Sequence, residues 1–186
     1  KKATITVMTE KDAPNEYVRR AERIIEPVYS GLAAGKDTWL KDNLSTLSAT
    51  AAIYAVDPDF APVVTSKVLP VIDKYLYSKR SPSAYSPRIN SVEAPDRLYD
   101  ENIRIGMDLT DLYMLTRDRK YLDKAEMIWR FVSQGIDLRG GMYPSEYARK
   151  SQDALINAYM AVFGAKLYLA TDNQDYLDIA KGVYLW

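Results

Sequence analysis

The chain of 186 residues contains neither cysteine nor histidine. The absence of cysteine excludes disulfide bonds and thiol nucleophiles, and the absence of histidine excludes a histidine general base. The usual zinc ligand sets are excluded with them. Acid and base chemistry in this protein therefore falls to carboxyl groups, and we expect it to require no cofactor.

The chain has no excess of charge of either sign, since 25 Lys and Arg residues balance 25 Asp and Glu residues. No basic face predicts nucleic acid and no basic run predicts a membrane surface, so an uncharged partner is favoured. Two long uncharged stretches, 44–56 and 154–165, are shorter than the roughly 20 residues of a membrane span. They predict buried helices of a globular protein rather than a membrane span.

Amphipathic segments alternate with apolar ones along the chain. Apolar residues recur at close to a helical period over 98–115, and the amphipathic segments lie at about 15–30, 59–79, 119–134 and 173–186. This alternation predicts an all-α fold of stacked helical hairpins, with the apolar helices inside and the amphipathic helices outside. We expect residues 1–14 to be an N-terminal extension of a domain formed by 15–186.

A repeated turn supports the hairpin array. The segment LYMLTRDRKYLDKA at 112–125 recurs 55 residues later as LYLATDNQDYLDIA at 167–180, and a weaker copy precedes both at 53–60. A fixed period of this size predicts an array in which each unit buries its face on the next. The aromatic that begins each outer helix is expected to pack the turn rather than to bind a ligand: Phe60, Tyr121 and Tyr176.

Two segments are predicted to be loops that lie at the same rim of the array. Residues 79–94 contain Pro82 and Pro87 among several serines, and residues 135–150 contain two adjacent glycines. Each segment precedes an apolar helix, so both should reach the same end of the stacked hairpins. Loops that gather at one rim are where binding and catalytic sites are commonly built.

Two adjacent acids, Asp100 and Glu101, follow the first of these loops. Pro95 and Asp96 predict a helix start nearby, because proline suits a first turn and an acid complements the helix dipole. One interpretation is that the acids only stabilise this dipole. The alternative is a joint site, since side chains about 100° apart can still both reach a cleft beyond the helix end. Paired carboxyl groups are how glycosidases cleave their substrates.

The chain resembles the glycoside hydrolase family 76 α-1,6-mannanases from about residue 21 to its end. The segment Tyr99-Asp100-Glu101-Asn102 is similar to the family's Tyr-Asp-Asp motif, and 153–158 is similar to its Asn-Ala-x-x-Asn-Ala helix start. The turn at 115–125 and the pair Gly140-Gly141 complete the ordered match. The resemblance implies an (α/α)6 toroid, of which this chain covers roughly the first half. It also implies a secreted, periplasmic or cell-surface location.

The same resemblance implies retaining hydrolysis of α-1,6-mannosidic linkages in a mannan-like polysaccharide or oligosaccharide. Asp100 would be the nucleophile and Glu101 the general acid/base. Glu101 departs from the family's second aspartate, and its longer arm changes the spacing of the two carboxyl groups. Substrate would be held by aromatic, amide and acidic side chains, each of which is also suited to packing or helix capping: Trp39, Asn43, Tyr99, Asn102, Tyr143, Asp153 and Asn157.

Two other functions remain open at this point. The departure at Glu101 is compatible with a catalytically silent toroid that still binds a glycan, and a helical array is also typical of scaffolds whose concave face binds a protein. Seven helices are slightly more than half of a toroid, and the chain ends inside an amphipathic segment. We therefore expect exposed apolar faces that dimerisation or further chain would cover.

Overall fold

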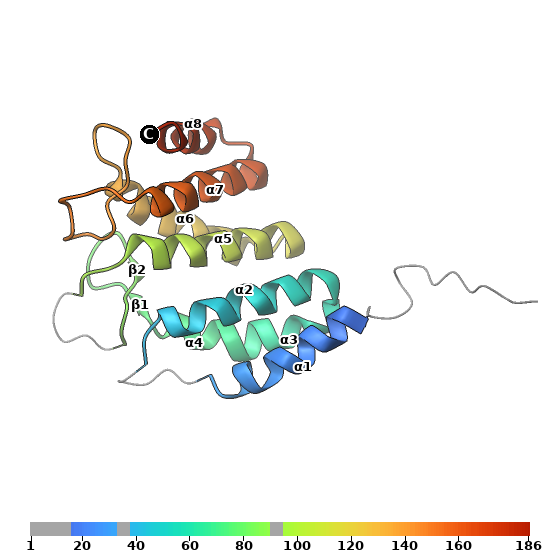
Figure 1. Ribbon diagram of the computed structural model, residues 1–186. Coiled ribbons are helices and arrows are strands. Elements are labelled where there is room, and N and C mark those ends of the chain that lie inside the picture. Colours follow the sequence, from blue (N-terminus) through green and yellow to red (C-terminus); the bar gives the residue numbers. More distant parts are fainter. Residues whose placement is uncertain (1–15, 33–37, 90–94) are drawn as a thin grey trace, which may run out of the picture.

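Helical hairpins stacked side by side form the computed structural model, which describes residues 16–32, 38–89 and 95–186 (Figure 1). The predicted extension 1–14 lies outside the described residues. In chain order the elements are α1 (Glu16–Ser30), α2 (Lys41–Val56), the 3-10 turn η1 (Pro58–Phe60), α3 (Ala61–Val63), the π-helical turn η2 (Val64–Val68), α4 (Leu69–Asp73), β1 (Leu76–Tyr77), β2 (Ala84–Tyr85), α5 (Tyr99–Thr116), α6 (Arg119–Val132), the 3-10 turn η3 (Ser133–Gly135), α7 (Ala154–Thr171) and α8 (Gln174–Tyr184).

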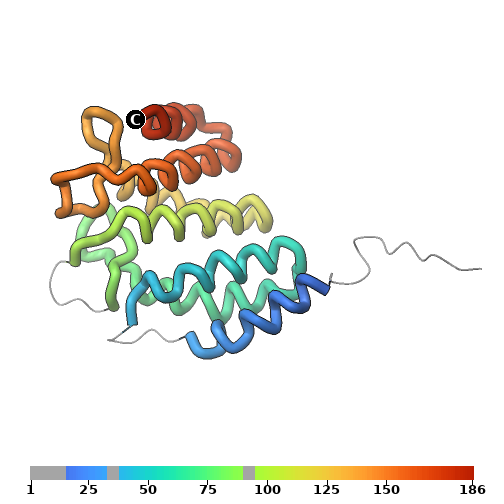
Figure 2. The backbone as a smooth tube through the Cα atoms, in the orientation of Figure 1, coloured from blue at the N-terminus to red at the C-terminus, as the bar shows by residue number. Residues whose placement is uncertain are grey.

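Helices α2, α5 and α7 lie side by side with their N-termini at the same end of the molecule (Figure 2). Each packs against the helical segment that follows it in the chain: η2 and α4, α6 and α8 respectively. Their shared core contains fully buried apolar side chains such as Leu47, Ile105 and Met160. The predicted all-α array of hairpins, with apolar helices inside, is therefore confirmed.

The two copies of the repeated turn have the same backbone conformation. Arg117 and Asp172, at equivalent positions, both adopt the left-handed conformation, with φ of 60° and 58°. The next residue caps the following helix in each copy: Asp118 accepts from the backbone N–H of Lys120 and Asn173 from that of Asp175, each at 3.1 Å. The sequence repeat thus encodes the same turn twice: a residue in the left-handed conformation followed by a side chain that caps the next helix.

The three repeated aromatics pack as predicted. Phe60 and Tyr121 are 8 % and 3 % exposed. The ring of Tyr176 contacts Trp129 of α6 edge-on, with 5.1 Å between the ring centroids. These side chains hold each turn against its neighbour.

The segment between α4 and α5 differs from the prediction. The helix expected over 59–79 ends at Asp73, and the chain then forms a two-stranded antiparallel hairpin in which Leu76 pairs with Tyr85 and Tyr77 with Ala84. Strand β2 lies within the predicted loop 79–94, of which residues 90–94 lie outside the described residues. The physical reason is a distant partner: the Asn102 side chain of α5 bonds both the N–H and the C=O of Tyr85.

Helix α5 begins at Tyr99, later than the proline at 95 predicted. Asp96 therefore lies before the first turn and does not complement the helix dipole there. Its carboxylate instead accepts hydrogen bonds from the Ser145 hydroxyl at 2.6 Å and from the Tyr147 backbone N–H at 3.1 Å. The backbone N–H of Tyr99 donates to the Pro144 carbonyl at 3.0 Å. The second rim loop therefore fixes the point at which α5 starts.

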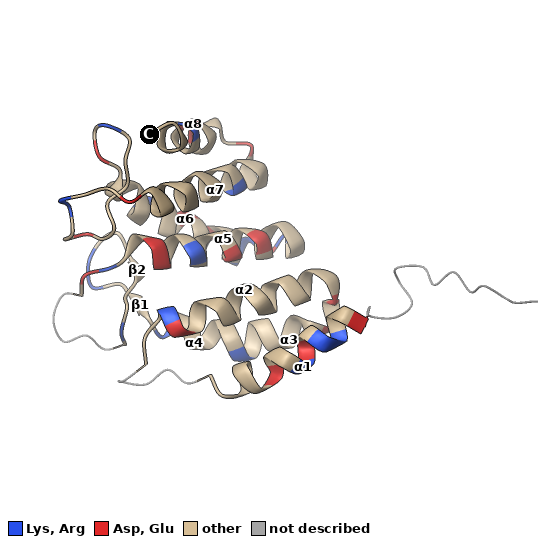
Figure 3. Cartoon of the chain, in the orientation of Figure 1, with Lys and Arg blue, Asp and Glu red and all other residues tan. Residues whose placement is uncertain are grey.

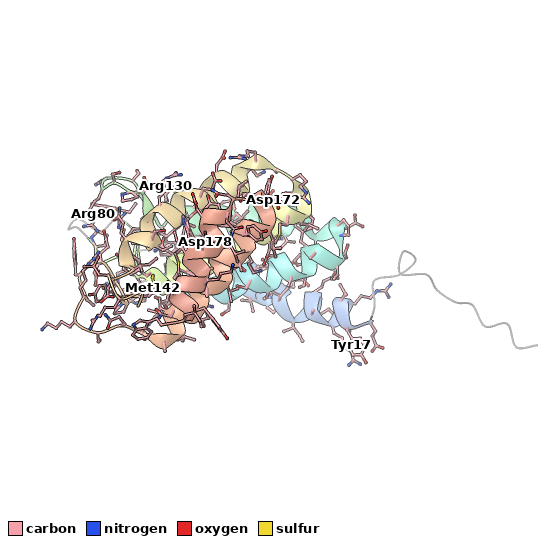
Figure 4. All side chains as sticks on the ribbon, turned by 90° about the horizontal axis from the view of Figure 1, so that it is seen from above. Tyr17, Arg80, Arg130, Met142, Asp172 and Asp178 are labelled. Carbon is pink, nitrogen blue, oxygen red and sulfur yellow. The ribbon has the colours of Figure 1, made fainter. Side chains whose placement is uncertain are left out.

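A buried ion pair joins the two rim loops. Arg97 is 0 % exposed, and its guanidinium donates to both carboxylate oxygens of Glu146 at 2.8 Å and to the Pro82 carbonyl at 2.6 Å. Arg80 also pairs with Glu146. In Figure 4, Arg80 and Met142 lie at the end of the molecule opposite Asp172, so the prediction that both loops share one rim is confirmed.

Helix α7 exposes an apolar stripe. Leu155, Val162 and Leu169 recur every seven residues and are 59 %, 47 % and 69 % exposed. The predicted exposure of apolar faces is therefore confirmed, and what covers them stays a prediction. By length and composition α7 could cross a membrane, and among the described helices it is the only one that could. In this fold it packs between α5 and α8.

Candidate active site

The first turns of α2, α5 and α7 meet at the rim that carries the loops. Figure 3 shows acidic residues at the rim end of α5, followed along the helix by a basic residue and then by further acidic ones. The predicted site residues come from all three helix starts and from the loop before α7. The fold therefore brings segments more than a hundred residues apart to one end of the molecule.

Glu101 is the most unusual side chain at this rim. It is 2 % exposed, and its Oε2 atom has no hydrogen-bond partner among the residues described. Burial raises the pKa of Glu101 from 4.5 to about 7, and the neighbouring charge of Asp100 adds to the rise. Lys41 and Arg104 oppose it. Near neutral pH this carboxyl group can therefore hold a proton and release it.

Asp100 is only half buried and faces different neighbours. Burial raises the pKa of Asp100, while hydrogen bonds from backbone N–H groups and the charge of Arg104 lower it. The charge of Asp153, at the start of α7, adds to the rise. Charges on α2, those of Lys41 and Asp42, thus affect the pKa of Glu101. The charge of Asp153, which precedes α7, affects the pKa of Asp100. The two acids differ in environment although they are adjacent in sequence.

On the α2 side, Trp39 and Asn43 lie at the helix start. Trp39 is 37 % exposed at the rim. Asn43 is buried, and its amide donates to the Trp39 carbonyl at 3.3 Å and to the Tyr75 hydroxyl oxygen at 3.1 Å. Asn43 therefore holds Trp39 in place, while Trp39 offers the exposed aromatic surface.

On α5, Tyr99 and Asn102 flank the acids and are both fully buried. The Tyr99 ring packs on Phe131, with 5.0 Å between centroids, and its hydroxyl oxygen accepts from Arg149 at 3.2 Å. The amide of Asn102 donates to the Tyr85 and Leu98 carbonyls at 2.9 and 2.8 Å. In this structure both side chains fix the turn that carries the acids, and their contact with substrate stays a prediction.

On the α7 side, Asp153 is exposed and caps the helix, accepting from the backbone N–H of Leu155 at 2.8 Å. The Asn157 side chain, 4 % exposed, accepts from the backbone N–H of Met142 at 2.6 Å. Its Nδ2 atom has no partner within the described part of the chain. The Tyr143 hydroxyl donates to Asp137 at 3.2 Å. Asn157 is therefore the amide with hydrogen-bonding capacity still free.

Sequence reasoning missed the charges around the acid pair. Lys41, Asp42 and Arg104 all act on Glu101. Asp108, one turn beyond Arg104, is largely buried; burial raises its pKa to about 6, although the Ser48 hydroxyl donates to it at 2.7 Å. The available signal was spacing, because positions 100, 104 and 108 recur every four residues and lie on one face of a helix.

Several solved structures have a fold similar to that of this chain, and the chain matches about half of each. A family 76 mannosidase from Bacteroides thetaiotaomicron matches with a TM-score of 0.73 at 24 % identity, over 91 % of this chain and 52 % of that one. An α-mannanase from the same organism matches with a TM-score of 0.78 at 20 % identity, over 94 % and 53 %. This chain therefore spans about half the length of these neighbours.

A third neighbour is an inactive variant of an α-1,6-mannanase from Salegentibacter sp. HEL1_6, in which two adjacent aspartates are replaced by asparagine. Its structure, in complex with α-1,6-mannotriose, matches with a TM-score of 0.69 at 21 % identity, over 91 % of this chain and 50 % of that one. At these identities the likeness establishes the α/α-toroid fold alone. No curated protein matches the chain in sequence.

Family assignment rests on the sequence itself. Residues 62–186, which include the acid pair, α5 to α8 and the second rim loop, match the family described as glycosyl hydrolase family 76. The match covers more than half of the chain. The chain therefore belongs to glycosyl hydrolase family 76.

Proposed function

We propose that this protein hydrolyses α-1,6-mannosidic linkages with retention of configuration, using Asp100 as nucleophile and Glu101 as general acid/base. Family membership supports a glycoside hydrolase. The choice of linkage follows the neighbours, one of which is an α-1,6-mannanase in complex with α-1,6-mannotriose. The location outside the cytoplasm that the family resemblance implies is part of the same proposal.

The burial of Glu101 beside Asp100 is the observation that carries this proposal. A general acid must hold its proton near the working pH, and burial raises the pKa of this group to about 7. The adjacent Asp100 is more exposed; burial raises its pKa too, but backbone hydrogen bonds and the charge of Arg104 oppose that rise. A carboxylic acid beside a carboxylate is the pair that retaining glycosidases use.

The proposed reaction has two steps. In the first, a carboxylate oxygen of Asp100 bonds to the anomeric carbon while the glycosidic C–O bond breaks, and Glu101 gives its proton to the departing oxygen. In the second, Glu101 takes a proton from water, whose oxygen bonds to the anomeric carbon as the ester bond to Asp100 breaks. Both groups then regain their starting states, and the anomeric configuration is inverted twice.

Substrate would lie across the rim between α2 and α7. Trp39 offers an aromatic surface on which a sugar ring can stack, and the buried amide nitrogen of Asn157 lacks a hydrogen-bond partner among the described residues. Asp153 and Tyr143 lie on the α7 side with polar atoms for hydroxyl groups. These four side chains are the substrate contacts that the arrangement supports best.

The test is release of reducing ends from linear α-1,6-mannan by the protein and by its Asp100→Asn variant. We expect turnover by the parent protein and a loss of at least about 1,000-fold in the variant, since removing one member of a catalytic unit costs that much. Asp123→Asn, an exposed aspartate on the outer helix α6, is the matched control and should keep its turnover. Equal rates for Asp100→Asn and the parent would refute the assignment of the nucleophile.

The extra methylene of Glu101 favours a second candidate, a toroid that binds mannan without cleaving it. Catalytic groups work within about 0.5 Å of their required positions, and a methylene exceeds that tolerance. This candidate predicts calorimetric binding of α-1,6-mannotriose with no reducing ends released. Restoration of turnover by Glu101→Asp would then identify the side-chain length as the cause.

A further inference from the structure

We propose that Arg88 is a positioning residue that holds the indole ring of Trp39 as a platform on which a sugar of the substrate stacks. This inference rests on the proposed function. Neither the family match nor the sequence pattern assigns a role to Arg88, which follows the hairpin β1–β2 at the rim.

Arg88 and Trp39 are joined through both their side chains and their backbones. The guanidinium carbon of Arg88 lies over the indole ring, 3.8 Å from its centroid. The two residues also form an antiparallel β-bridge, and the backbone N–H of Leu40 donates to the Pro87 carbonyl at 3.0 Å. Residues opposed in such a bridge project to the same side, so the stack follows from the backbone pairing.

The segment that carries Arg88 is itself anchored to the core. The backbone N–H of Ser86 donates to the Tyr75 carbonyl at 2.9 Å, and the Ser86 hydroxyl bonds the carbonyl of Arg88. The Tyr75 hydroxyl is within hydrogen-bond distance of the Asn43 amide, 3.1 Å away. Asn43 in turn bonds the Trp39 carbonyl. The ring and the guanidinium are therefore presented by two segments that share one buried tyrosine.

Trp39 keeps accessible ring surface in this arrangement. The residue is 37 % exposed even with the guanidinium of Arg88 over its ring and the Lys41 ammonium 5.4 Å from the ring centroid. A guanidinium on an indole restricts the tilt of the ring, because sliding off loses the contact. A pyranose ring stacking on an indole needs a fixed orientation, since an ordered platform reduces the entropy lost on binding.

Calorimetric titration with α-1,6-mannotriose tests this inference in an Asp100→Asn background, which prevents turnover. Arg88→Ala and Arg88→Lys should each weaken binding about 2- to 5-fold, because an ammonium cannot replace the planar stack. In a Trp39→Ala background, Arg88→Ala should have no further effect. Arg119→Ala, an exposed arginine on α6, is the matched control and should bind as the parent does.

Two results would overturn the inference: unchanged affinity in Arg88→Ala, or a further loss of affinity when Arg88→Ala is added to Trp39→Ala. The second would mean that Arg88 contacts the sugar directly. Absence of any mannotriose binding would overturn it as well. The proposed hydrolysis fails separately, through absence of reducing-end release by the parent protein, and that result leaves an Arg88 effect on binding intact.

Discussion

Replacement of Glu101 by glutamine should stabilise the protein at high pH while removing its activity. The parent carboxyl group is buried, one of its oxygens has no partner within the described part of the chain, and its pKa is raised from 4.5 to about 7. In the unfolded chain this group ionises near its ordinary pKa. As pH rises from 4.5 to 7, the unfolded state releases a proton that the folded state retains, so the free energy of unfolding falls.

The size of this effect follows from the shift. Each pKa unit corresponds to about 1.4 kcal/mol, so ionisation of Glu101 costs the folded state at most about 3.5 kcal/mol well above pH 7. At pH 5 most of this cost is absent. The stability gained by Glu101→Gln should therefore be larger at pH 8 than at pH 5 by roughly 2 to 3 kcal/mol. Any cost of burying the new amide group is present at both pH values and cancels.

Urea unfolding at the two pH values measures this difference directly. Glu26→Gln, at an exposed position on α1, is the control and should change stability by less than about 0.5 kcal/mol at either pH. An equal effect of Glu101→Gln at pH 5 and pH 8 would refute the reasoning, because it would mean that Glu101 ionises in the folded protein as it does in the unfolded chain.

Three further substitutions test the packing that positions the site. Gly106→Ala should lower stability by about 1 to 3 kcal/mol in thermal unfolding, because the added methyl group would overlap the Phe163 ring between α5 and α7. Glu146→Gln should cost about 3 kcal/mol, since it removes the charge that faces fully buried Arg97; urea unfolding unchanged from the parent would contradict this. Asn102→Ala should cost about 2 to 3 kcal/mol by leaving strand backbone groups unpaired, and a loss of activity at full stability would instead indicate direct substrate contact.

The fold was predictable from sequence where local chemistry determines it. The repeated turns depend on a left-handed residue followed by a capping side chain, and both features are encoded within a few residues of Arg117 and Asp172. The same holds for the helices around them. Local signals therefore identified the hairpins, their order and the rim at which the loops meet.

Elements that depend on distant partners were not predictable in the same way. The side chain of Asn102 bonds the backbone of strand β2 and holds it in place. Helix α5 starts after Asp96 rather than at it, because the Asp96 carboxylate accepts hydrogen bonds from the loop at 145–147. The pair Arg97 and Glu146 is 49 residues apart in sequence. No local pattern marks such contacts, since each residue alone is typical of an exposed loop.

The site was predictable from sequence only where its residues are close together in the chain. The acid pair stands out in sequence because two carboxyl groups adjoin a helix start. The pKa of Glu101 depends on its burial in the fold and on charges such as that of Lys41 on α2, sixty residues earlier in the chain. The stack of Arg88 on Trp39 likewise requires the backbone pairing of two separate loops. Sequence could identify the groups, but the fold determines their protonation and orientation.

The central claim, that Asp100 and Glu101 carry out retaining hydrolysis, is tested most directly by the anomeric form of the first product. Proton NMR of α-1,6-mannan digestion follows the newly released reducing ends before they equilibrate. Two displacements at the anomeric carbon predict that the α anomer appears first. Initial appearance of the β anomer would contradict the account, because it would show a single displacement by water without a covalent intermediate on Asp100.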